Sequence, residues 1–129
     1  MKVENCTLLK ALNCNVDETI VNVAKTLKEN KQRRIIIIDE KKSPVGIIST
    51  TDINNKIVAE NNDPNKITAK DIMNELYLIC DCNDDLGDIY EKMIEHKSFF
   101  VPVTKETKLY AVLTYGELVH NVKEAIKGN

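Results

Sequence analysis

The chain has 129 residues, of which 43% are hydrophobic and 29% charged, and its formal net charge is −2 at pH 7. This length suits one compact module, and the near-neutral charge argues against a nucleic-acid partner, which would select a concentration of basic residues. No apolar run reaches the roughly 20 residues of a membrane span, and residues 1–5 lack a signal region. We therefore expect a cytoplasmic protein with reduced cysteines and no membrane partner.

The first half of the chain predicts a strand, a helix, two strands and a second helix. Residues 1–15 show little pattern apart from a short strand near Cys14. Asp17 is the expected N-cap of a helix whose apolar residues recur at helical spacing. The β-branched run at residues 34–38 is typical of a strand covered on both faces. The expected ranges are a helix over 18–30, strands over 34–38 and 45–48, and a helix over 50–60.

The second half repeats this order. The expected elements are a helical turn over 68–73, a strand over 77–80, a helix capped by Asn83, strands over 99–103 and 109–113, and a closing helix. The inward residues of the two long helices are expected to be Leu86, Ile89, Tyr90, Met93 and Ile94, and then Leu118, Val119, Val122, Ala125 and Ile126. The equivalent residues Asp17 and Asn83 lie 66 positions apart, and Ser49 and Thr114 lie 65 apart, so the chain contains an internal repeat.

The repeat predicts an α+β (α/β-like) fold of two β-α-β-β-α units. Neither unit is large enough to bury its apolar face alone. We therefore expect the two to pack about a pseudo-twofold axis as one module over residues 1–129, with the first unit at 1–62 and the second at 63–129.

A hydroxyl and a carboxylate lie three residues apart where a strand runs into a helix, at Ser49 and Asp52. The first turn of a helix has unpaired N–H groups and a partial positive charge, which favour an anion or a carboxylate. The pair is either a capping box or part of a ligand site, and the two roles are compatible. Thr114 with Glu117, and Thr68 with Asp71, have the same spacing.

Three stretches together resemble a tandem pair of cystathionine-β-synthase (CBS) domains. They are Val45-Gly46-Ile47-Ile48-Ser49-Thr50-Thr51-Asp52-Ile53, Lys70-Asp71-Ile72-Met73 and Val101-Pro102-Val103. The resemblance implies a regulatory or sensor module that needs no cofactor. It would bind AMP, ADP, ATP or S-adenosylmethionine in a cleft between the two motifs and signal to a protein effector. It also implies a homodimer formed through the helices.

The resemblance also implies which residues meet the ligand. Asp52 would hold the ribose hydroxyls, with Ser49 and Thr50 near the ribose or phosphate. The remaining candidates are the backbone at Asn13–Cys14 and Ile36–Ile37 for the base, and the second-half equivalents Ile79, Cys80, Pro102, Val103, Thr114 and Glu117.

The second motif departs from the family pattern, because Ala111 replaces the glycine, Glu117 replaces the aspartate, and Tyr115-Gly116 fills the spacer. These changes could alter or close its site. Arg33 and Arg34 either face a ligand phosphate or are solvated hinge charges. They align with Phe99 and Phe100, so the two sites would differ in charge.

No catalytic or metal site is expected. Cys80-x-Cys82 lacks the usual zinc-ligand spacing, and neither His96 nor His120 lies in a recognisable nucleophile motif. The chain is therefore expected not to be an enzyme. The alternative to an adenosyl sensor is a ligand-independent interaction or dimerisation scaffold, in which both acids only cap their helices.

Overall fold

The structure, a computed structural model, describes the backbone of residues 1–127 and the side chains of residues 1–124. It confirms the mixed α+β fold with two three-stranded sheets. The chain forms two compact units, which we name after their acids. The Asp52 unit is Leu12–Leu76, and the Glu117 unit combines Met1–Ala11 with Tyr77–Asn129. No helix among the described residues is both long and apolar enough to cross a membrane.

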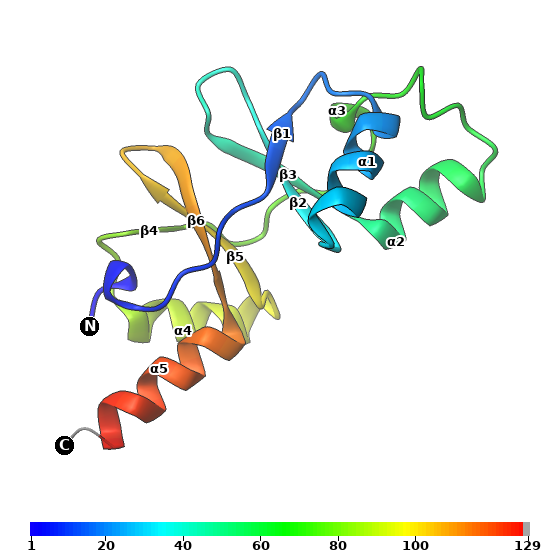
Figure 1. The fold of residues 1–129 in the computed structure, drawn as a ribbon. Helices are drawn as coiled ribbons and strands as arrows, with labels where there is room; N and C mark the ends of the chain where they lie inside the picture. Colours follow the sequence, from blue (N-terminus) through cyan, green and yellow to red (C-terminus); the bar gives the residue numbers. More distant parts are fainter. Residues whose placement is uncertain (128–129) are drawn as a thin grey trace. The chain divides into compact units, whose positions relative to one another are not determined.

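The Asp52 unit is a three-stranded sheet with three helices packed against it (Figure 1). The strand order is β1-β2-β3, with β1 parallel to β2 and β2 antiparallel to β3. Its elements are β1 (Asn13–Asn15), α1 (Ile20–Asn30), β2 (Arg34–Ile38), β3 (Pro44–Ser49), α2 (Thr50–Ile53), a π-helical turn (Asn54–Val58) and α3 (Ala69–Ile72). Ile35, Ile36 and Ile37 are all fully buried, as expected for a strand covered on both faces.

The Glu117 unit repeats the same order and pairing in β4-β5-β6. Its elements are a 3₁₀ turn (Val3–Asn5), β4 (Cys80–Asp81), α4 (Leu86–His96), β5 (Phe100–Lys105), β6 (Lys108–Thr114) and α5 (Tyr115–Lys127). β4 shares only Cys80 with the strand expected over 77–80, because only Cys80 and Asp81 pair with β5; Tyr77 and Ile79 are exposed. The core of this unit is built from both helices, the sheet and the N-terminal residues Val3 and Cys6.

Helices α1 and α4 each begin two residues later than the sequence predicted. Thr19, not Asp17, caps α1, with its Oγ1 accepting from Asn22 N at 3.4 Å. Asp85, not Asn83, caps α4, with its Oδ2 accepting from Asp88 N at 3.2 Å. Several residues before each helix are good caps, and sequence alone does not choose among them.

Three side chains expected to face inward are exposed instead. Tyr90 and Ile94 on α4 are 39% and 47% exposed, and Val122 on α5 is 40% exposed. Leu86, Ile89, Met93 and Leu118 are buried as predicted. Ala125 and Ile126 lie outside the described side chains.

Each unit is completed by a segment that precedes the repeat of the other half. These lead-in segments, residues 1–9 and 67–74, make matching contacts 65 or 66 residues apart. At the start of each long helix, Leu86 N donates to Met1 O at 2.8 Å in the Glu117 unit, and Ile20 N donates to Ile67 O at 2.9 Å in the Asp52 unit. At the last strand of each sheet, Leu9 forms a β-bridge with Val112 in the Glu117 unit, and Asn74 forms one with Ile47 in the Asp52 unit.

The lead-in contacts explain why the compact units do not divide at residue 62. Residues 1–11, expected to be loosely structured, bury Val3 completely and leave Cys6 6% exposed. Residues 63–76 remain with the first half of the chain through Thr68 and Asn74.

Candidate ligand site at Asp52

The strand-to-helix junction at the end of β3 forms a complete capping box. Ser49 Oγ accepts from Asp52 N at 3.1 Å, and Asp52 Oδ2 accepts from Ser49 N at 2.7 Å. The Ser49 hydroxyl also donates to Asp52 Oδ2, at 2.9 Å. The capping interpretation of this pair is therefore confirmed, and it fixes the carboxylate at the first turn of α2.

Two residues that the sequence analysis did not single out complete the surroundings of Asp52. Asn74 Nδ2 donates to Asp52 Oδ2 at 2.8 Å, and the Asn74 backbone is hydrogen-bonded to Ile47 in both directions. Lys56 Nζ lies 3.9 Å from Asp52 Oδ1 and donates to Ile72 O and Asn74 Oδ1, both at 2.8 Å. The signals were present: Lys56 is four residues after Asp52, and Asn74 directly follows the Lys70–Met73 motif.

The Asp52 carboxylate is held in its ionised form. Burial alone would raise the pKa of Asp52, but the hydrogen bonds from Asn74 and Ser49, together with the Lys56 ammonium, lower it below the usual value. The two oxygens differ in environment. Oδ2 accepts three hydrogen bonds, whereas Oδ1 faces Lys56 at the edge of ion-pair distance and keeps hydrogen-bonding capacity. The side chain is 18% exposed.

The structure brings most of the first-half candidates together at one sheet. Arg34 pairs with Ser49 across β2 and β3, and Thr50 N donates to Arg33 O at 3.0 Å, so both arginines flank the junction. Asn13 and Cys14 lie beside Ile36 and Ile37 in the parallel pairing of β1 with β2.

The second-half candidates lie at equivalent places in the Glu117 unit. Cys80 pairs with Val103 and Pro102 with Val112, while Ile79 precedes β4. Thr114 Oγ1 accepts from Glu117 N at 3.2 Å, the first half of a capping box. Tyr115 lies against Phe99 and Tyr90, with ring centroids 5.5 Å and 6.1 Å apart, so it packs into an aromatic cluster.

Gly46 gives the Lys70–Met73 motif its place against β3. A Cβ at this position would lie 2.5 Å from Met73 Sδ and 2.8 Å from its Cγ. Carbon atoms essentially never approach this closely, so any larger residue at position 46 would displace the Met73 side chain from its place on β3. Two of the three motifs that carried the resemblance, Val45–Ile53 and Lys70–Met73, are therefore in close steric contact.

The cysteines are shielded thiols. Burial, with Glu18 nearby, raises the pKa of Cys14 to about 11, and burial, with Asp84, Cys82 and Asp81 nearby, raises that of Cys80 to about 12. Among the described residues, no three His, Cys, Asp or Glu side chains gather as a metal site would require.

Comparison with known proteins supports the pattern seen in the two units. The family model for the CBS domain matches twice, at residues 10–59 and 69–124. A protein of Methanopyrus kandleri, MK0525, is 24% identical over 103 residues, which are 79% of this chain but only 53% of that protein. Hypoxic response protein 1 of Mycobacterium tuberculosis is 25% identical over 107 residues, 83% of this chain and 75% of that one.

Solved structures share the fold. The crystal structure of Hypoxic Response Protein I, with two coordinated zinc ions, has a TM-score of 0.76 at 22% identity and covers 93% of this chain and 98% of that one. The hexameric CBS-CP12 protein of bloom-forming cyanobacteria has a TM-score of 0.74 at 17% identity, covering 100% of this chain and 75% of that one. The repeated sheets, the repeated strand-to-helix junctions and the two family matches lead to one conclusion: the chain belongs to the CBS domain family, as a tandem pair.

Proposed function

We propose that this chain is a regulatory module whose Asp52 unit binds an adenine nucleotide or an S-adenosylmethionine-type compound through its ribose. Tandem CBS domains are generally regulatory, bind adenosyl ligands and are typically non-catalytic. In this proposal the module has no reaction of its own, and its output passes to a protein effector. Ligand binding acts on that effector only if it favours one conformation of the module over another.

The observation that carries the proposal is the state of the Asp52 carboxylate. It is ionised, it is fixed by hydrogen bonds from Ser49 and Asn74 to Oδ2, and its Oδ1 can still accept hydrogen bonds. The adjacent hydroxyls of a ribose are donors that such an oxygen accepts well. Because the carboxylate is already fixed, little further ordering is needed on binding.

The rest of the proposed site follows from the neighbours of Asp52. Ser49 and Thr50 would meet the ribose or phosphate, and Arg33 and Arg34, which flank them, would meet phosphate oxygens. Backbone groups of the paired strands at Asn13–Cys14 and Ile36–Ile37 would meet the base. A second site at Ile79, Cys80, Pro102, Thr114 and Glu117 is a weaker part of the proposal, because Leu9, which cannot donate a side-chain hydrogen bond, takes the place that Asn74 has in the Asp52 unit.

One observation favours the alternative, a ligand-independent scaffold. Asp52 Oδ2 is fully used by the capping box and Asn74, and this arrangement is complete without a ligand. A test must therefore separate the capping role of Asp52 from its ligand role.

Asp71 offers a matched control for that test. It forms the same capping box with Thr68, with Oδ2 accepting from N at 2.9 Å and from Oγ1 at 3.0 Å. We would measure thermal unfolding of wild type, Asp52→Asn and Asp71→Asn with AMP, ADP, ATP, S-adenosylmethionine and 5′-methylthioadenosine. A ligand at about 100 times its Kd stabilises by roughly 2.7 kcal/mol, which raises Tm by several degrees.

The proposal expects a ligand-dependent rise in wild type and Asp71→Asn that Asp52→Asn loses. Both variants remove one capping acid, so a difference between them isolates the ligand role. If no compound shifts Tm in wild type, or if Asp52→Asn responds as wild type does, the scaffold is the better function.

A further inference from the structure

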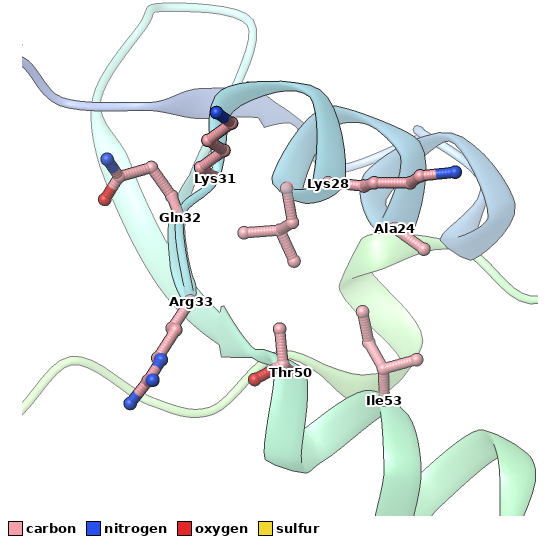
Figure 2. A pocket seen from close by; sticks show the side chains of 8 residues that line it. Ala24, Lys28, Lys31, Gln32, Arg33, Thr50 and Ile53 are labelled. Atoms are coloured by element: carbon pink, nitrogen blue, oxygen red, sulfur yellow. The ribbon is translucent and has the colours of Figure 1, made fainter.

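The Asp52 unit has a pocket of about 400 Å³ between α1 and α2 (Figure 2). Pockets that hold small molecules usually measure roughly 300–1,000 Å³, so this volume is sufficient for a small ligand. Figure 2 shows Thr50 and Ile53 pointing from α2 toward the middle of the pocket. Among the described residues, neither Asp52 nor its partners Ser49 and Asn74 line it, so the pocket is separate from the Asp52 carboxylate.

The lining of the pocket combines an apolar floor with a basic rim. The floor is formed by Ala24, Leu27 and Ile53, and the rim by the exposed side chains of Lys28, Lys31 and Arg33. None of the described lining residues is acidic, although the whole chain has a net charge of −2. An apolar surface surrounded by cations favours a ligand that has an apolar body and a negative charge.

The Glu117 unit fills the equivalent volume with its own aromatic rings. Counting 65 or 66 residues along the repeat, the places of Ala24, Arg33 and Thr50 are taken by Tyr90, Phe99 and Tyr115, which we call the aromatic cluster. The Tyr115 ring stacks with that of Tyr90 and meets that of Phe99 edge-on. The fold therefore accommodates rings at this place, and the small side chains of Ala24 and Thr50 leave the same place open in the Asp52 unit.

The charges around the pocket and around the aromatic cluster are opposite in balance. Residues 20–34, which include α1 and the basic rim, have five basic side chains and one acidic one. Residues 86–100, which include α4 and Phe99, have three acidic side chains and two basic ones. An anion is therefore favoured at the pocket and disfavoured at the aromatic cluster.

From these observations we propose that the pocket is a binding site for a small aromatic anion, such as an aryl carboxylate or sulfonate. The ring would lie on the apolar floor, where the Glu117 unit has rings of its own, and would displace water from apolar surface. The anionic group would lie at the mouth, within reach of the long side chains of the basic rim. This inference does not rest on a ligand at Asp52, and the pocket would be a second, independent ligand site.

The probe for this site is 8-anilinonaphthalene-1-sulfonate (ANS), an aromatic anion whose fluorescence increases in apolar surroundings. Titration of the full chain should give saturable binding in low salt and a higher Kd in high salt, because exposed cations are screened. Filling the pocket tests the position of the probe. Ala24→Tyr/Thr50→Tyr introduces two of the rings of the Glu117 unit, and thermal unfolding checks that the variant is folded. Its Kd for ANS should be at least roughly tenfold higher than that of wild type.

Tyr90→Ser/Phe99→Ser is the control for binding at the exposed rings of the aromatic cluster, and it should bind ANS as wild type does. Three results would overturn the inference. They are an absence of saturable binding to wild type, normal binding to the filled variant, and loss of binding in Tyr90→Ser/Phe99→Ser, which would place the probe on the aromatic cluster.

Removing the rim charges tests whether the site is selective for an anion, and it leaves the packing unchanged because these side chains are exposed. Lys28→Gln/Lys31→Asn should raise the Kd for ANS roughly threefold or more in low salt. Asparagine is chosen at position 31 because Lys31 has a φ of 54°, which asparagine tolerates. Lys25→Gln/Lys41→Gln removes the same charge outside the pocket and should bind ANS as wild type does. Equal weakening in the two variants would mean that only net charge matters, and would overturn the inference.

Two further titrations separate the pocket from the other contacts expected of this chain. Asp52→Asn should bind ANS as wild type does, whatever its response to adenosyl compounds; loss of ANS binding would make the pocket part of the Asp52 site. Wild type is also titrated at low and high protein concentration, because self-association through the helices could cover the pocket. Binding confined to the low concentration would assign the pocket to a contact between copies and overturn the inference.

Discussion

The two strand-to-helix junctions of this chain have the same backbone but different chemistry. In each, a hydroxyl at the end of a strand accepts from the N–H of an acidic residue three positions later, at 3.1 Å in Ser49–Asp52 and 3.2 Å in Thr114–Glu117. Among the described residues, the Asp52 carboxylate alone of the two acids accepts from the capping residue in return and is also held by a side chain from another segment, that of Asn74. A hydroxyl and an acid three residues apart therefore form a helix cap by themselves, and the further contacts of the acid distinguish the candidate site.

The residue that lies beside each junction comes from a lead-in segment. At the position where residues 67–74 place Asn74 beside Ile47, residues 1–9 place Leu9 beside Val112. A leucine cannot donate to a carboxylate. The difference between the two junctions is therefore decided by a segment distant in sequence, which is a long-range property of the fold.

The helices after the junctions are anchored in related ways. Lys56 donates to Ile72 O and Asn74 Oδ1, whereas its equivalent Asn121 accepts through Oδ1 from Thr7 N and Thr7 Oγ1, both at 3.2 Å. Both residues join their helix to its lead-in segment. Lys56 in addition brings a positive charge to the acid, which Asn121 does not.

The largest effect is expected from adding a methyl group at Gly46. Gly46→Ala forces Met73 away from β3 and should lower the free energy of unfolding by about 1–3 kcal/mol, the usual cost of overpacking. The reverse change at the equivalent position, Ala111→Gly, should cost about 1 kcal/mol or less, since it only loosens the strand. Urea denaturation measures both. Equal costs would mean that Met73 does not confine Gly46.

The next effect is the unequal cost of removing the two acids. Asp52→Ala leaves Asn74 Nδ2 and Ser49 N without their acceptor and should cost about 1–2 kcal/mol. Glu117→Ala keeps the Thr114 cap and should cost roughly 0.5 kcal/mol or less. Chemical denaturation of Asp52→Ala and Glu117→Ala compares the two costs. Asp52→Ala is also measured in an Asn74→Leu background, which gives the Asp52 unit the leucine that the Glu117 unit has at Leu9. Asp52→Ala should cost less in the Asn74→Leu background; an unchanged cost would show that the two side chains are not coupled.

A smaller effect follows from pH. Since the folded-state pKa of Asp52 is below that of the unfolded chain, its ionised form stabilises the fold above the usual aspartate pKa of about 3.9. This contribution is lost as the pH falls through the lowered value. The difference in unfolding free energy between wild type and Asp52→Asn should therefore be constant near neutral pH and shrink below about pH 4. A difference that grows on acidification would mean that the pKa is raised instead.

The sequence predicted what depends on local pattern and repetition. The 65- and 66-residue spacing predicted the fold class and the order of the elements, both of which the structure has. The three-residue spacing of a hydroxyl and an acid offered a capping box as one interpretation at Ser49 and at Thr68, and the structure has both boxes. The predicted starts of α1 and α4 were two residues too early, because Asp17 and Asn83 are as good caps as Thr19 and Asp85.

The rest depends on contacts between distant residues. Asn74 directly follows the Lys70–Met73 motif, but no local pattern shows which unit residues 1–9 and 67–74 complete, so neither the contact of Asn74 with Asp52 nor that of Leu9 with Val112 could be assigned. Helical periodicity likewise put Tyr90 and Ile94 in the core, although helical spacing does not distinguish a face covered by its own unit from an exposed apolar one. The missed features are therefore those that the proposals above use most.

The smallest effect compares Cys14 and Cys80, which are also equivalent in the repeat. With pKa values of about 11 and about 12, the two native thiols should be alkylated slowly at pH 8, because only the thiolate reacts. Cys80 is only 2% exposed and is surrounded by acidic groups, so it should react at least severalfold more slowly than the half-buried Cys14. Mass spectrometry of iodoacetamide-treated protein follows each site, and the urea-unfolded chain, where both should react alike, is the control. If native Cys80 reacts as fast as Cys14, the Glu117 unit opens far more readily than its packed core implies, and the contrast between the two units then lies in their dynamics as well as in their side chains.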